Sequence, residues 1–219
     1  MKQLIIKDIR LLGFVNLIVI IVAIIGGYIG ATFVESLKAN FAYGFSMIVS
    51  LFLINNMISA KESKTKSDPL MISMPVNKFD IIKARYFTMI IYVSGILGTM
   101  YIVSHLSKII FGHINGNPLD LIGISIISSI MIIFLSFHIP FQYYSLQSAQ
   151  LFSVFLYLLI MLAPNIINRL NIDISSLSFI ETILTMDFAI IGSILLVVAL
   201  VFYFISSLVS KGIYEAKEF

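Results

Sequence analysis

The chain has 219 residues, of which 59% are hydrophobic and only 11% are charged, and its formal net charge is +3. Because soluble domains carry about 25% charged residues, this composition excludes a soluble globular fold. The apolar runs are about 20 residues long, as in membrane-spanning helices, whereas a β-barrel shows alternating segments of about 10 residues. We therefore expect an all-α, polytopic membrane protein with a single transmembrane domain over residues 1–219. The positive charge is typical of cytoplasmic loops, so no nucleic-acid partner is expected.

Residues 1–10 are the first predicted element. On a helix, Leu4, Ile5 and Ile9 share one face and polar residues share the other. This pattern favours an elbow helix that lies in the membrane interface, although a plain positively charged flank explains it equally well.

Six spanning helices are predicted along the chain. They cover about residues 11–31, 39–58, 87–104, 119–139, 151–165 and 188–210. The first run is longer than the core of a signal peptide, which has roughly 7–15 residues, so we interpret it as an uncleaved span. Gly26 and Gly30 on this span form a GxxxG pair, which allows a close contact with another helix.

The positive residues set the expected orientation. With the N-terminus in the cytoplasm, all but three of the 14 Lys and Arg residues lie inside, and Lys38, Lys108 and Arg169 lie outside. We therefore expect both termini on the cytoplasmic side of the cell membrane. Residues 164–187 then form an outer segment between the fifth and sixth spans, where an extracellular hairpin is expected.

No recognised catalytic motif is present. The sequence lacks a phosphate loop of the form GxxxxGK[ST], a zinc-protease HExxH and a nucleophile elbow GxSxG. It has no cysteine, which excludes disulfides and thiol chemistry, and His105, His113 and His138 are too scattered to predict a metal site. The predicted spans carry no charged residue in their cores, which disfavours an ion-coupled transporter. We expect no enzyme activity and no cofactor bound by this chain.

Residues 59–86, predicted as a cytoplasmic loop between the second and third spans, are the only long charged stretch. Apolar residues alternate with the charges there, which favours docking at the membrane surface over a purely solvated linker. Pro75 is suited to the first turn of a helix, and Val76, Phe79 and Ile82 then fall near one face. An amphipathic segment that only rests on the inner leaflet is the alternative.

The same stretch carries a family resemblance. The sequence SMPV at residues 73–76 follows a charged run and is itself followed by Lys78 and by ARY at residues 84–86. This order resembles the loop between the second and third spans of ABC-2 type transporter permeases, in the branch of the phenol-soluble modulin exporter permeases. The first twelve residues also resemble the start of that branch.

The resemblance implies a fold and a mechanism. The fold is the ABC-2 (type V exporter-like) permease fold, with six transmembrane helices. Two such permease subunits, in a homodimer or heterodimer, form the path, and each docks a coupling helix onto a separate cytoplasmic ABC ATPase subunit, which binds ATP and Mg. The implied ATPase-coupling residues are Pro75, Val76, Asn77, Lys78, Phe79, Asp80, Ile82 and Lys83.

We therefore expect a permease subunit of an ATP-binding-cassette exporter for an amphipathic peptide or another hydrophobic substrate. The alternative is an ATPase-independent immunity or sensor module that sequesters a membrane-active peptide, which would keep its activity without an ATPase. Two further alternatives are an ion-coupled transporter, recognised by gradient-dependent uptake, and an unrecognised membrane enzyme, recognised by turnover with the purified chain.

Overall fold

The computed structural model describes residues 2–65, 77–110, 116–145, 147–155, 158 and 187–216. Apart from short connections, the chain in these ranges is helical, and it contains no β-strand there. The predicted all-α fold is confirmed for this part of the chain. Pro75, Val76 and residues 164–186 of the predicted hairpin lie outside the described residues.

Six helices carry the architecture. They are α1 (Lys2–Leu12), α2 (Phe14–Thr32), α3 (Ser36–Thr65), α5 (Lys78–Ile110), α6 (Leu121–Tyr144) and α9 (Phe188–Ala216). Residues 147–155 are also helical. Gly13 separates α1 from α2 with a positive φ of 48°, a conformation that glycine adopts without steric cost, so α1 is a helix of its own.

Five helical segments in the described part of the chain are long and apolar enough to cross a membrane. They are Phe14–Thr32, Lys38–Lys61, Phe79–Ile110, Leu121–Tyr144 and Phe188–Ala216, and they match the first four predicted spans and the sixth. Of the predicted fifth span only residues 151–155 and 158 are described, all of them helical, so the six-span count stays a prediction.

Two of these helices extend well beyond their predicted spans. Helix α3 continues to Thr65 and α5 begins at Lys78, so both reach into the stretch predicted as a loop. The reason is that backbone hydrogen bonding continues past the point where apolar side chains give way to charged ones. Hydropathy alone marks only the apolar part.

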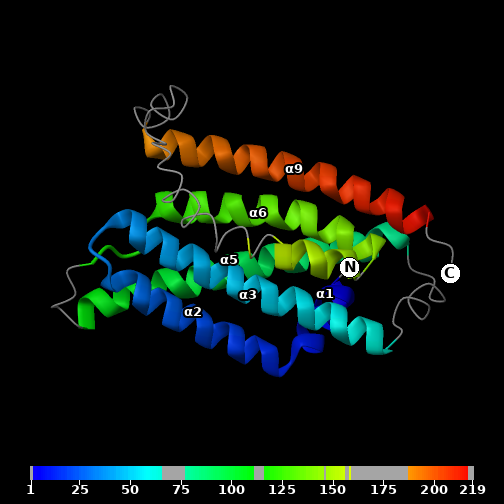
Figure 1. Cartoon of the computed structure of the whole chain (residues 1–219), viewed down its shortest axis with the longest axis horizontal. Helices are drawn as coiled ribbons and strands as arrows, with labels where there is room; N and C mark the ends of the chain where they lie inside the picture. Colours follow the sequence, from blue (N-terminus) through cyan, green and yellow to red (C-terminus); the bar gives the residue numbers. More distant parts are fainter. Residues whose placement is uncertain are drawn as a thin grey trace.

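The spanning helices lie side by side in one bundle (Figure 1). Helices α3, α6 and α9 run towards the end that holds α1, and α2 and α5 run away from it. We call this end the terminal end. The start of α5 and the ends of α3, α6 and α9 therefore meet there.

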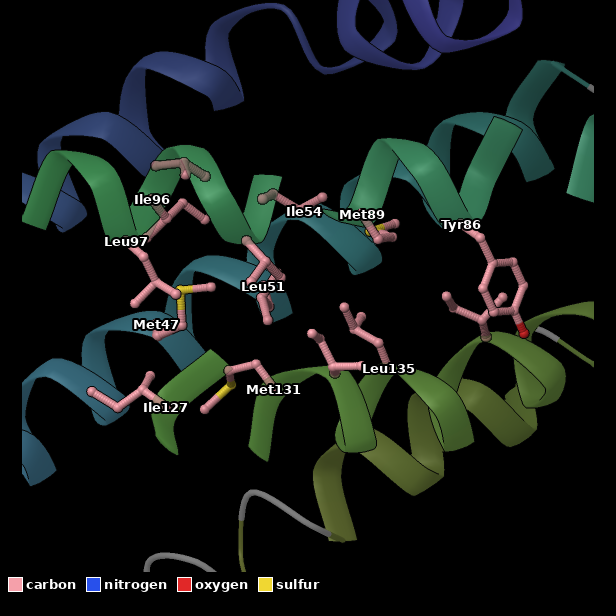
Figure 2. Close-up of a cluster of buried hydrophobic side chains, with 14 of the residues drawn as sticks. Met47, Leu51, Ile54, Tyr86, Met89, Ile96, Leu97, Ile127, Met131 and Leu135 are labelled. Carbon is pink, nitrogen blue, oxygen red and sulfur yellow. The ribbon is translucent and has the colours of Figure 1, made fainter. Parts of the chain in front are cut away.

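The centre of the bundle is apolar and closely packed. Figure 2 shows side chains of α3, α5 and α6 that meet there, among them Met47, Leu51, Met89, Leu97, Met131 and Leu135, all buried. Helix α9 packs mainly on α6 and is the least buried of the five candidate spans. In lipid its exposed apolar side chains need no further cover, because lipid tails are as apolar as leucine.

The GxxxG pair of α2 makes a close helix contact within the chain. Gly26 and Gly30 are both buried. A Cβ atom built on Gly26 would overlap Ser46 of α3, and one built on Gly30 would overlap the ring of Tyr43. The predicted close contact at these two glycines is confirmed, and its partner is α3.

Candidate functional site

The predicted coupling segment coincides with the start of α5. Asn77 caps this helix: the backbone N–H of Phe79 donates to Asn77 Oδ1 at 3.1 Å, and the N–H of Asp80 donates to the Asn77 carbonyl oxygen at 2.9 Å. Asp80 also lies in the first turn, where a negative charge complements the helix dipole. The described part of the segment is therefore the first turns of a spanning helix rather than a separate short helix. No proline interrupts α5 up to Ile110, so the helix continues without a break from the coupling segment into the third span.

The side chains of this segment divide between surface and core. Asn77 is exposed, and Phe79, Asp80 and Lys83 are half-buried. We call these four residues the α5 foot. Ile82 is fully buried and belongs to the hydrophobic core, so it is not part of the surface that the foot presents.

The aromatic ring of the foot lies against two ammonium groups. Lys83 Nζ is 4.1 Å and Lys211 Nζ is 5.2 Å from the centroid of the Phe79 ring. Both contacts fall within the range of cation–π attraction, which at exposed sites contributes about 0.5–1 kcal/mol. Because Lys211 belongs to α9, the end of α9 is held beside the foot. The surface there combines an aromatic ring with charges of both signs, since Asp80 belongs to the foot and Glu215 lies 3.8 Å from Lys211.

A buried ion pair joins α5 to α1 one turn further into the bundle. Arg85 Nη1 lies 3.4 Å from Asp8 Oδ2, and the two side chains are only 7% and 6% exposed. Lys7 Nζ lies 3.3 Å from the other carboxylate oxygen of Asp8. Charges this buried persist only when they are paired, so α1 is tied to α5 at this point. A hydrogen bond from the Tyr92 hydroxyl group of α5 to Asn16 Oδ1 of α2, at 2.7 Å, extends the connection.

Tyr86, the next residue along α5, joins the same region to α9. Its hydroxyl group lies 2.6 Å from Ser206 Oγ and 2.8 Å from Ser210 Oγ. The Tyr203 hydroxyl group donates to the Tyr86 carbonyl oxygen at 2.7 Å, and the two tyrosine rings pack edge to face at 4.7 Å. Ala84, Arg85 and Tyr86 are all buried. They fix the start of α5 within the bundle and present no docking surface.

Sequence analysis did not predict the ion pair, because it singled out no role for Asp8 and placed Arg85 in the charged loop and the family motif. A signal was present in α5, since Arg85 follows Ile81 and Ile82 by one turn and precedes Met89 by one turn, and all three are buried. Residues with this spacing share one helix face. A charge on such a face predicts a buried partner.

Comparison with known protein families decides the identity. The profile described as ABC-2 family transporter protein matches residues 3–215. The chain belongs to the ABC-2 family of transporter proteins. It is therefore a membrane-spanning permease of the ABC-transporter class, a transport component that works with an ATPase subunit. No curated protein and no solved structure gives a match to it.

Two apolar grooves flank α5 of this ABC-2 permease. One, of about 430 Å³, lies between α2 and α5 and includes Asn16 and Tyr92. The other, of about 490 Å³, lies between α5, α6 and α9 and includes Ser94 and Ser128. Because most of their lining residues are apolar, both grooves suit hydrocarbon chains or apolar side chains better than ions.

Proposed function

We propose that this ABC-2 permease is the membrane subunit of an exporter in the cell membrane, that it forms the export path together with a second permease, and that its α5 foot receives the separate ATPase. The substrate class is an amphipathic peptide or another hydrophobic molecule. ATP and Mg are bound by the ATPase, since the sequence of this chain has no phosphate loop.

The observation that carries the proposal is the continuity of α5. The foot and the third span form one helix of 33 residues, so a displacement of the foot displaces the span as a rigid element. The Asp8–Arg85 ion pair and the hydrogen bonds of Tyr86 join this element to α1 and α9. An ATPase that moves the foot therefore has a direct mechanical connection to three helices.

Two features support a cytoplasmic terminal end and six spans. Basic residues are concentrated at the terminal end of the described helices, among them Lys2, Lys7, Arg10, Lys61, Lys83 and Lys211, as expected for cytoplasmic segments. Helix α6 ends at the terminal end and α9 begins at the opposite end (Figure 1). Because residues 147–155 after α6 are helical and α9 begins at the other end, a fifth span between α6 and α9 is favoured.

The chemistry of the spans supports the substrate class. The grooves beside α5 are apolar, and the charged residues Asp8 and Arg85 are paired with each other near the terminal end rather than placed along a path. Ion-coupled transporters place ionisable groups inside the bundle as relays. The resemblance of the N-terminal segment and of residues 73–86 to peptide-exporter permeases supports the same choice.

Affinity purification of the tagged chain in mild detergent tests the proposal. We expect a P-loop ATPase to co-purify with the native chain and to be lost with Phe79→Asp, because the substitution removes the apolar ring and both of its cation–π contacts and adds a negative charge to the foot. Phe33→Asp is the matched control, since Phe33 is exposed at the opposite end of the bundle. Absence of any ATPase, under conditions that keep other membrane complexes intact, would favour the sequestering module instead.

A further inference from the structure

Helices α3 and α6 share a polar seam in the half of the bundle near the terminal end. The two helices run in the same direction (Figure 1), and Gln142 Nε2 of α6 donates a hydrogen bond to Ser59 Oγ of α3. This bond sets the register. Asn55 and His138 lie one turn further from the terminal end on the same two helix faces, because residues four apart share a face. All four residues are at most 8% exposed.

The seam is apolar beyond these two turns. Leu51 and Met47 continue the α3 face, and Leu135 and Met131 continue the α6 face (Figure 2). These four side chains are at most 2% exposed. The polar residues are thus confined to one section of an otherwise apolar helix contact.

Several polar atoms of this section have no hydrogen-bond partner within the described ranges. They are both amide atoms of Asn55, the Nδ1 atom of His138 and the Oε1 atom of Gln142. Each such group left unsatisfied costs about 1–3 kcal/mol, and native proteins keep few of them. A buried water makes about 2–4 hydrogen bonds. The three side chains lie within two helical turns and together offer enough polar atoms to bind one.

We propose that Asn55, His138 and Gln142 form a water-binding site between α3 and α6. Water at this place satisfies the amide and imidazole groups, while the Leu51 and Leu135 turn closes the site towards the opposite end. The hydration does not depend on transport.

Cysteine labelling of the full chain in membrane vesicles tests the site, and the absence of native cysteine makes single variants possible. The probe is hydrogen peroxide, which is little larger than water and oxidises the thiolate, a form that a thiol adopts readily only where it is hydrated. The sulfenic acid formed is labelled after denaturation. We expect Ser59→Cys, which leaves Asn55, His138 and Gln142 in place, to react at least about tenfold faster than Leu51→Cys. Met57→Cys is the control for depth, because Met57 lies close to Asn55 along α3 but is exposed on the outer face of the helix, and it should be as slow as Leu51→Cys.

Two results would overturn the proposal. Ser59→Cys reacting no faster than Leu51→Cys and Met57→Cys would mean a dry seam, and equal fast labelling at all three positions would mean no localised site. The role of Asn55 is tested by labelling Ser59→Cys with Asn55→Leu present, and thermal unfolding of this double variant checks that it is folded. We expect the rate to fall several-fold, since leucine removes two of the water partners, and an unchanged rate would contradict the role of Asn55. Loss of ATPase co-purification would refute the proposed function and leave these labelling results untouched.

Discussion

Replacing Arg85 with methionine should destabilise the protein strongly. The substitution keeps most of the side-chain volume and removes the guanidinium group that lies 3.4 Å from Asp8. Breaking a buried ion pair on one side costs about 3–5 kcal/mol, because the other charge stays buried without its partner. Lys7, 3.3 Å from Asp8, compensates in part, so we expect a loss of about 3 kcal/mol.

Thermal unfolding in detergent measures this loss. For a chain of this size 1 kcal/mol shifts Tm by about 2–4 °C, so Arg85→Met should lower Tm by about 6–12 °C. Asp8→Leu combined with Arg85→Met should recover most of the shift, since a buried pair replaced by apolar residues is often neutral or better. An unchanged Tm for Arg85→Met, or a double variant no more stable than the single one, would refute the ion pair as the link between α1 and α5.

Two further predictions concern helix contacts and use the same unfolding assay. Gly30→Val should lower the free energy of unfolding by about 1–3 kcal/mol, because its side chain would overlap the Tyr43 ring. The control Gly44→Ala, with no neighbour within 4 Å, should be neutral or slightly stabilising. Equal effects of the two variants would contradict a close contact between α2 and α3. Tyr86→Phe should lower the free energy of unfolding by about 1–3 kcal/mol, because two hydrogen bonds to serine are lost. The control Tyr144→Phe, at an exposed side chain, should leave the free energy of unfolding unchanged.

Hydropathy located the five described candidate spans because each is a long apolar run, the property that a membrane span mainly requires. It could not locate the ends of α3 and α5, since the backbone hydrogen bonds of a helix do not stop where apolar side chains stop. The glycine pair of α2 was recognisable because small residues four apart permit close approach. Only the structure shows that this pair packs against α3, with Tyr43 at Gly30.

The charged and polar contacts were less predictable. Arg85 pairs with Asp8 although 77 positions of sequence separate them, and Gln142 bonds to Ser59 over a separation of 83 positions. Such pairs depend on the register between helices, which a single sequence does not contain. The motif at residues 84–86 gave no sign that its side chains face inwards, and only the packing shows that they are buried while Phe79 and Asp80 are partly exposed.

A photo-crosslinker in place of Asp80, used in intact cells, tests the central claim most directly. Asp80 lies in the α5 foot, and Glu35, exposed in the turn at the opposite end, is the matched control position. The account predicts that the crosslinker at Asp80 captures a P-loop ATPase and that the one at Glu35 does not. Capture of no ATPase from Asp80, while other neighbours are captured, or equal capture from both ends, would contradict a permease driven through the α5 foot.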